Sequence, residues 1–175
     1  MSPTCLVVMG VSGVGKTTAA RLLSQRLGWP MAEADEFHPA ANIAKMAAGT
    51  PLTDADRTPW LTAIRDWIGA RGTAGEHTVV TCSALKRAYR DVLRQAPGTR
   101  VRFVHLRGTP ETVAPRLAER SGHFMPPSLL ESQFRDLEPL GADEDGVTVD
   151  VSDAPEEIVA RALTRLGLAG TSSAV

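Results

Sequence analysis

The hydrophobic positions of this 175-residue chain follow two alternating patterns. Short apolar runs rich in β-branched residues predict buried strands, and stretches with apolar residues at helical spacing follow them. The predicted strands lie at residues 5–8, 29–34, 77–82, 101–106 and 146–151, and predicted helices begin near residues 16, 40, 58, 83, 109, 128 and 154. Strands that alternate with helices in this way predict an α/β fold with a doubly wound parallel sheet.

Two stretches interrupt the regular alternation. Helical patterns at 40–48 and from Thr58-Pro59 onward predict an insertion at residues 36–74, where nucleotide-dependent kinases commonly carry the acceptor substrate. A short irregular segment at 120–128 is typical of a lid. We therefore expect one domain over residues 1–170, with a frayed tail at 171–175.

The segment from residue 10 to residue 18 connects the first predicted strand to the first helix. It reads Gly10-Val11-Ser12-Gly13-Val14-Gly15-Lys16-Thr17-Thr18 and contains the pattern G-x-x-x-x-G-K-[ST]. Glycines let successive backbone N–H groups curl around a phosphate, and the helix N-terminus adds further N–H groups. Lys16 can reach the β- and γ-phosphates, and the Thr17 hydroxyl can ligate Mg²⁺. The segment predicts a site for ATP and Mg²⁺; the alternative is a glycine-rich turn without a ligand.

Composition narrows the possible partners. With 19 basic and 20 acidic side chains the formal net charge is −1, so no bulk positive field attracts nucleic acid or an anionic membrane. We find no signal-peptide pattern and no apolar run near 18 residues, and we expect a cytoplasmic protein. Cys5 and Cys82 lie in or at the end of predicted strands without a C-x-x-C spacing, which predicts small core residues.

Candidate acceptor residues follow the second predicted strand. Asp35 lies at the carboxyl end of this strand, the edge of a parallel sheet where ligands bind. It can accept the proton of an attacking hydroxyl or merely orient it, and it can bind an Mg²⁺-coordinated water; the alternative role is a helix N-cap. His38 can hydrogen-bond a hydroxyl of the acceptor or be a turn residue. Arg57 suits a carboxylate because its planar fork binds two oxygens, although it could also cap a neighbouring helix.

Further candidates lie beyond the third and fourth strands. Lys86 and Arg90 follow the third strand and are candidate substrate contacts; the alternative is a solvated basic stripe. Arg120 is expected in the lid, where it would stabilise transferred charge. Arg116 either stacks on adenine or faces solvent, and His123 is a further candidate in the lid.

Several segments of the chain resemble the gluconokinase family of phosphate-loop kinases. The matching segments include Met9-Gly10-Val11-Ser12-Gly13, Asp35-Glu36-Phe37-His38-Pro39, Gly49-Thr50-Pro51-Leu52-Thr53-Asp54, Cys82-Ser83-Ala84-Leu85-Lys86 and Ser132-Gln133-Phe134. The resemblance implies a P-loop NTPase fold with sheet order 2-3-1-4-5, ATP-dependent phosphorylation of D-gluconate at the 6-hydroxyl, and a homodimer. Where the family often has aspartate and glycine before the position of Asp35, this chain has Glu33 and Ala34.

Two other functions remain open at this stage. Shikimate kinases share the sheet, the phosphate loop and an aspartate after strand two, but that family has a glycine-rich segment after strand three, where this chain has Ser83-Ala84-Leu85-Lys86. A nucleotide-regulated binding module is the alternative from another class. A guanine-specific switch of that kind would carry an N-K-x-D-like base reader, and none of Lys16, Lys45 and Lys86 has that context.

Overall fold

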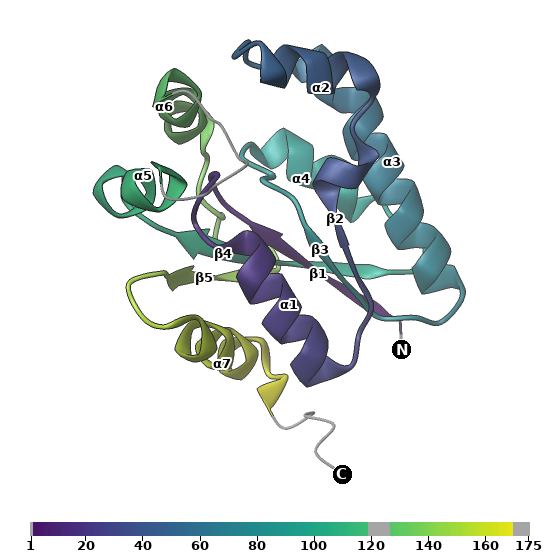
Figure 1. Cartoon of the computed structure of the whole chain (residues 1–175). Helices are drawn as coiled ribbons and strands as arrows, with labels where there is room; N and C mark the ends of the chain where they lie inside the picture. The colour runs from purple at the N-terminus through teal and green to yellow at the C-terminus, as the bar shows by residue number, and fades with distance from the viewer. Residues whose placement is uncertain (1, 119–126, 170–175) are drawn as a thin grey trace.

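A five-stranded parallel sheet forms the centre of the molecule. The computed structural model describes residues 2–118 and 127–169. The strands are β1 (Thr4–Met9), β2 (Met31–Glu33), β3 (Thr78–Thr81), β4 (Arg100–Arg107) and β5 (Gly146–Asp150). They pair in the order β2-β3-β1-β4-β5, which confirms the expected topology (Figure 1).

Helices cover both faces of the sheet, so its central strand is apolar on both sides. Leu6 and Val8 of β1 pack in one core cluster with α1 (Lys16–Leu27) and α7 (Pro155–Leu166). Val7 and Met9 point the other way, into a cluster with α3 (Asp54–Thr73) and α4 (Arg87–Arg94). This alternation explains why residues 5–8 form a continuous apolar run.

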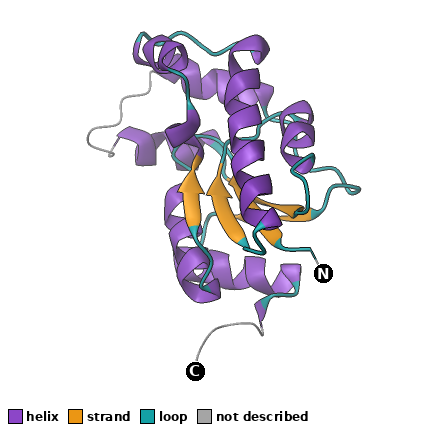
Figure 2. Ribbon diagram, turned by 90° about the vertical axis from the view of Figure 1, so that its right-hand side faces the viewer, coloured by secondary structure: helices purple, strands orange, loops and turns teal. Residues whose placement is uncertain are grey.

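The carboxyl ends of the strands meet at one edge of the sheet, where the remaining helices lie. In Figure 2 the strand arrows point upward, away from the C-terminus. The short 3-10 helix η1 (Ala34–Phe37) and helix α2 (Ala40–Ala47) follow β2. Helix α5 (Pro110–Ala118) follows β4, and α6 (Pro127–Asp136) precedes β5. Figure 1 shows α2 and α6 both above the sheet. These elements place the insertion and the helix after the expected lid on the same edge.

Helix α3 begins five residues earlier than the sequence pattern predicted. We expected Thr58 as the N-cap, but the helix begins at Asp54 with Thr53 as its N-cap. Thr53 Oγ1 accepts a hydrogen bond from Asp56 N–H at 3.1 Å, and Asp56 Oδ2 accepts one from Thr53 N–H at 2.9 Å. This capping box satisfies two donors at once, whereas Pro59 lies inside the helix.

The two cysteines are buried and unpaired, as predicted for core residues. Burial raises the pKa of both thiols to about 12. They are therefore protonated and unreactive in the folded protein. Among the described residues no helix is both long and apolar enough to cross a membrane.

Candidate active site

The phosphate loop takes the backbone path that its glycines allow. Gly10 has a φ of +145°, and a Cβ at this position would lie 2.8 Å from the carbonyl oxygen of Leu106. Gly15 has a φ of +103° and occupies the N-cap of α1, where no side chain of the described residues makes a capping hydrogen bond. The first turn of α1 contains no acidic residue. Its N–H groups are therefore suited to an anion.

Two side chains pack directly on this loop. Lys16 Nζ donates to the carbonyl oxygens of Gly10 at 2.9 Å and Val11 at 3.1 Å, which holds the ammonium group over the loop. Gln133 reaches the loop from α6: its Oε1 accepts from Ser12 N–H at 2.7 Å and its Nε2 donates to Ser12 Oγ at 3.0 Å. The loop is thus tied to the helix that follows the expected lid.

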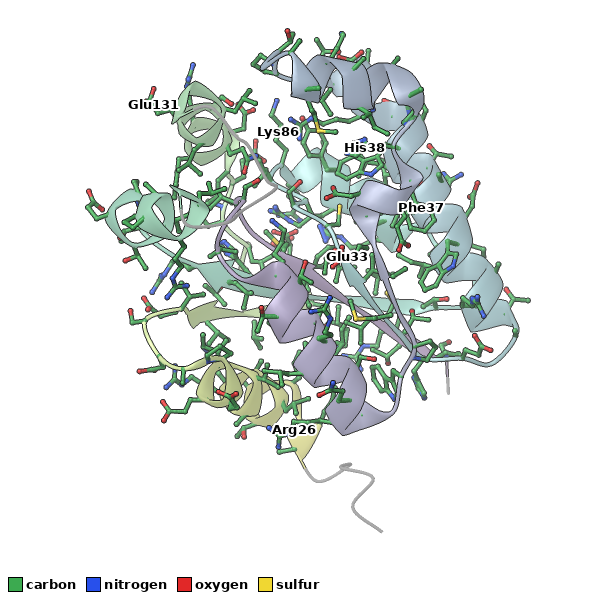
Figure 3. All side chains as sticks on the ribbon, viewed as in Figure 1. Arg26, Glu33, Phe37, His38, Lys86 and Glu131 are labelled. Carbon is green, nitrogen blue, oxygen red and sulfur yellow. The ribbon has the colours of Figure 1, made fainter. Side chains whose placement is uncertain are left out.

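A cavity of about 620 Å³ opens beside the phosphate loop at the carboxyl edge of the sheet. Lys16 and Thr17 line it together with Asp35, His38 and Arg57, so the structure brings the expected phosphate and acceptor residues into one space. Figure 3 shows Glu33 and His38 near this edge and Arg26 at the opposite end of the molecule. The other residues that line the cavity include Arg21, Glu33, Met46, Thr50, Leu52, Trp60, Ser83, Leu129 and Gln133.

His38 is held between an aromatic ring and an amide. Its ring stacks on Trp60 with centroids 4.2 Å apart and planes 12° from parallel. Trp60 Nε1–H donates to the carbonyl oxygen of Ala34 at 2.7 Å, next to Asp35. Asn42 Nδ2 lies 3.3 Å from His38 Nδ1. Burial lowers the pKa of His38, the charge of Asp35 opposes this change and the charge of Arg57 adds to it. The imidazole is therefore neutral at pH 7.

Arg57 lines the cavity, and it forms no ion pair with a carboxylate of the described residues. Its guanidinium carbon lies 5.1 Å from the centroid of the Tyr89 ring, and its buried Nε has no hydrogen-bond partner among the described residues. Asp54 lies on the same helix but pairs with other groups: it accepts hydrogen bonds from the hydroxyl of Tyr89 and from Lys86 Nζ. These two hydrogen bonds, followed by the charges of Lys86 and Arg57, lower the pKa of Asp54.

Arg90 does not contact this cavity, and the prediction that it binds substrate is wrong. Its side chain is fully buried, and Nε and Nη2 bind the two carboxylate oxygens of Glu144 at 2.7 Å and 3.0 Å. Nη1 donates to the carbonyl oxygen of Ala84 at 2.8 Å. Ala84 has a φ of +44°, so Arg90 supports an unusual turn after β3. The role of Arg90 is structural.

Lys86 also differs from its predicted role. It is the N-cap of α4, which begins at Arg87 rather than near Ser83. Its ammonium group lies 3.2 Å from Asp54 Oδ1, with 29% of the side chain exposed, and Lys86 is not among the residues that line the cavity. Figure 3 shows Lys86 above the sheet, between α6 and α2. Lys86 therefore binds Asp54, which also accepts a hydrogen bond from Tyr89, the residue whose ring lies against Arg57.

The expected adenine and lid residues have different outcomes. Arg116 lines a second, smaller pocket beside the phosphate loop, together with Asp153 and Pro155, and its Nη2 donates to the carbonyl oxygen of Val151 at 3.1 Å. This position suits an adenine contact. Arg120 and His123, with most of the segment 120–128, lie outside the described residues.

Sequence reasoning missed four residues that shape the site: Arg21, Asn42, Trp60 and Gln133. Trp60 falls at helical spacing with apolar neighbours, a pattern typical of core residues; it is buried, but it also lines the cavity. Gln133 belongs to a segment that carries the family resemblance, without an assigned role. Asn42 likewise belongs to a matching segment, Asn42-Ile43, without an assigned role, and Arg21 carries no sequence signal beyond its place on a predicted helix.

The oxygen donors in the cavity suit Mg²⁺. Thr17 and Asp35 both line it, and a hydroxyl, a carboxylate and phosphate oxygens are the ligands that this hard cation prefers. The described residues contain no group of three or more His, Cys, Asp or Glu side chains that could hold a metal ion unaided. This agrees with a cation that would share its ligands with a nucleotide.

Comparison with known proteins gives one consistent family. The family described as "AAA domain" matches residues 6–140. The gluconokinase of Gluconobacter oxydans is 49% identical over 159 residues, which cover 91% of this chain and 89% of that protein. The crystal structure of a gluconokinase from Sinorhizobium meliloti superposes with a TM-score of 0.83 at 48% identity, covering 94% of this chain and 92% of the other.

More distant structures share only the fold. Shikimate kinase from Aquifex aeolicus has a TM-score of 0.61 at 17% identity, with coverage of 93% of this chain and 96% of that one. This likeness supports the phosphate-loop kinase architecture and carries no information on the acceptor.

Proposed function

We infer that this chain, which belongs to the gluconokinase family, is the enzyme that transfers the γ-phosphoryl group of ATP to the 6-hydroxyl of D-gluconate. The products are 6-phosphogluconate and ADP. The sequence alternatives, a shikimate kinase and a nucleotide-regulated module, find no comparable support in the relatives.

The position of Arg57 is the observation that carries this proposal. Its guanidinium lines the same cavity as the phosphate loop, and its buried Nε has no hydrogen-bond partner within residues 2–118 and 127–169. A planar fork of donors binds a carboxylate through two parallel hydrogen bonds. Arg57 therefore binds the carboxylate of the sugar acid, and the distal hydroxyl of the acid extends toward the phosphate loop.

Phosphoryl transfer asks the protein for positioning and charge neutralisation. Lys16, with the N–H groups at the start of α1, binds the β- and γ-phosphate oxygens. Asp35 orients the attacking hydroxyl and accepts its proton. His38 hydrogen-bonds another hydroxyl of the acid. Thr17, and Asp35 through a water molecule, hold Mg²⁺, which when bound offsets negative charge on the phosphates.

The remaining assignments are part of the same proposal. Arg116 contacts adenine, while Arg120 and His123 act in a lid at 120–128 that excludes water. The helices at residues 36–74 form the acceptor-binding insertion within one kinase domain at 1–170. The enzyme works in the cytoplasm as a homodimer. Family resemblance supports the homodimer, and the supply of ATP and Mg²⁺ supports the compartment.

The direct test is a coupled measurement of ADP release with D-gluconate or shikimate as acceptor. ATP turnover that depends on D-gluconate supports the proposal. Turnover with shikimate alone, or ATP hydrolysis that neither acid stimulates, overturns it.

Two variants test the assigned roles. Arg57→Gln removes the fork and should raise KM for gluconate roughly 10- to 100-fold while KM for ATP stays near the wild-type value. Arg65→Gln is the matched control, because Arg65 lies on the same helix but pairs with Asp66 at the surface. Asp35→Asn should lower kcat roughly 10²- to 10⁴-fold. Normal turnover of this variant would refute the role of Asp35.

A further inference from the structure

We propose that Asn42 fixes His38 in the tautomer that carries its proton on Nε2, so that His38 presents a hydrogen-bond donor to the cavity. The contact between His38 and the sugar acid rests on the proposed function. The tautomer itself follows from contacts within the protein and can be tested without substrate.

The direction of the Asn42 amide follows from its other partner. Asn42 is 3% exposed, and its Nδ2 lies 2.8 Å from the carbonyl oxygen of Asp56. A carbonyl oxygen only accepts hydrogen bonds, so the NH₂ end of the amide must face it. The same Nδ2 lies 3.3 Å from His38 Nδ1. Its second hydrogen is thus directed at the imidazole ring.

A ring nitrogen that accepts a hydrogen bond carries no proton. In a neutral imidazole one nitrogen donates and the other accepts. Because Asn42 supplies a donor at Nδ1, the proton of His38 lies on Nε2. The hydroxyl or carboxylate oxygen that meets Nε2 must therefore accept a hydrogen bond. Asp35, which lines the same cavity, instead offers a carboxylate that accepts a hydrogen bond from a hydroxyl.

The surroundings of the ring keep it neutral and fixed in place. Trp60 of α3 stacks on one face, and its own tie to Ala34 prevents the pair from rotating freely. The charged groups that act on His38 are Asp35 of η1 and Arg57 of α3, whose effects on its pKa oppose each other. Across the α2–α3 contact, Lys45 pairs with Asp56 Oδ2 at 2.7 Å, so this charge is already neutralised.

Nitrogen-detected NMR of the uniformly ¹⁵N-labelled full chain reads the tautomer directly. The chain contains four histidines, and His38→Gln identifies the signals of residue 38 by their loss. We expect a protonated Nε2 and an unprotonated Nδ1 in the wild type at neutral pH. A proton on Nδ1 in the wild type would overturn the proposal, whatever the enzyme's activity.

Asn42→Asp inverts the key contact, because a carboxylate accepts where the amide donated. We expect the proton of His38 to move to Nδ1 or the ring to become doubly protonated. Lys45→Ala is the control: it removes another contact between α2 and α3 without touching His38, and it should leave the tautomer unchanged. An unchanged tautomer in Asn42→Asp, or an equal change in Lys45→Ala, would show that Asn42 does not select it. The wild-type spectrum remains decisive if Asn42→Asp does not fold.

Kinetics separate this inference from the proposed function. A glutamine amide reaches the position of Nε2, whereas an asparagine amide reaches only that of Nδ1. His38→Gln should therefore retain more gluconate affinity than His38→Asn, with KM for gluconate in the latter raised roughly three- to tenfold, the loss of one hydrogen bond. If gluconate leaves the His38 signals unmoved, the proposed contact fails while the tautomer stands. If His38→Asn equals or surpasses His38→Gln, the donor role at Nε2 is wrong.

Discussion

Gln133 binds two polar groups of Ser12, accepting from its backbone N–H at 2.7 Å and donating to its hydroxyl at 3.0 Å. The two residues lie 121 positions apart in the sequence. Ser12 belongs to the phosphate loop, and Gln133 belongs to the helix that follows residues 119–126. The two hydrogen bonds therefore join α6 to the phosphate loop.

This contact predicts an order of ATP affinities. Gln133→Ala removes both hydrogen bonds and should raise KM for ATP several-fold, about the value of one or two neutral hydrogen bonds. Gln133→Glu should raise it further, because a carboxylate cannot donate to the Ser12 hydroxyl and repels the phosphates. Initial rates at saturating gluconate measure both. A wild-type KM for ATP in Gln133→Glu would contradict the proposed proximity to phosphate.

The Tyr89 ring lies against the Arg57 guanidinium, and its hydroxyl binds Asp54. The ring and the hydroxyl can be tested separately. Tyr89→Leu removes the ring beneath the guanidinium and should raise KM for gluconate roughly two- to fivefold, the value of a weak cation–π contact. Tyr89→Phe keeps the ring and loses only the hydroxyl that donates to Asp54. Its KM should stay near the wild-type value. Equal kinetics of both variants would show that the ring does not position Arg57.

The buried Arg90–Glu144 pair should dominate stability in its region. Burial raises the pKa of Glu144, but the hydrogen bonds from Arg90 and from Gly141 N–H outweigh this and hold it below its ordinary value. Glu144→Ala leaves Arg90 buried without its partner and should cost roughly 3–5 kcal/mol of unfolding free energy. Urea denaturation measures the loss.

The neighbouring Asp143 provides the control for this prediction. Asp143 pairs with Arg87, and 68% of its side chain is exposed. Asp143→Asn should therefore leave the urea midpoint nearly unchanged. If Glu144→Ala and Asp143→Asn have similar midpoints, the buried pair does not brace the turn at Ala84.

His105 makes the fold sensitive to acid. Burial, with a smaller effect of the charges of Arg90 and Arg107, lowers the pKa of this imidazole to about 4. The unfolded chain then binds more protons than the folded chain between pH 6.5 and 4, so stability is full above this window and falls within it. The loss at the lower end is on the order of 3 kcal/mol.

Replacing His105 tests this assignment. Neither ring nitrogen has a hydrogen-bond partner in the part of the chain that the structure describes, so His105→Leu removes no such bond. The variant should show a flatter dependence of unfolding free energy on pH between 4 and 6.5. His38, whose pKa is also lowered, leaves a residual slope of the same sign. A slope equal to that of the wild type would refute the role of His105.

Local pattern and topology were enough to predict the elements around the phosphate loop and the edge of the sheet where Asp35 lies. The strand before Gly10 and the helix after Lys16 follow from apolar periodicity, and in a parallel sheet the carboxyl end of β2 must bring Asp35 to the same edge. The sheet order matched the one that the family resemblance implied.

Two of the errors arose where the deciding partner is distant in sequence, and one, the start of α3, was decided by neighbouring residues. Arg90 has the same local pattern whether it faces a crevice or the core, and its partner Glu144 lies 54 positions later. Residues 53–59 contain two plausible helix starts, and the reciprocal hydrogen bonds of Thr53 and Asp56 decided between them. The amide of Asn42 gained its role only through the packing of α2 on α3.

The stacking of Trp60 on His38 also places an intrinsic fluorophore at the site. An indole in face-to-face contact with an imidazole reports changes in that ring through its emission. A second such pair, Trp29 with His77, lies where β2 and β3 begin, at the opposite edge of the sheet. Trp60 is one of three tryptophans in the chain and the one that stacks on the imidazole lining the cavity, so a variant that keeps only this indole is expected to report acceptor binding through its emission.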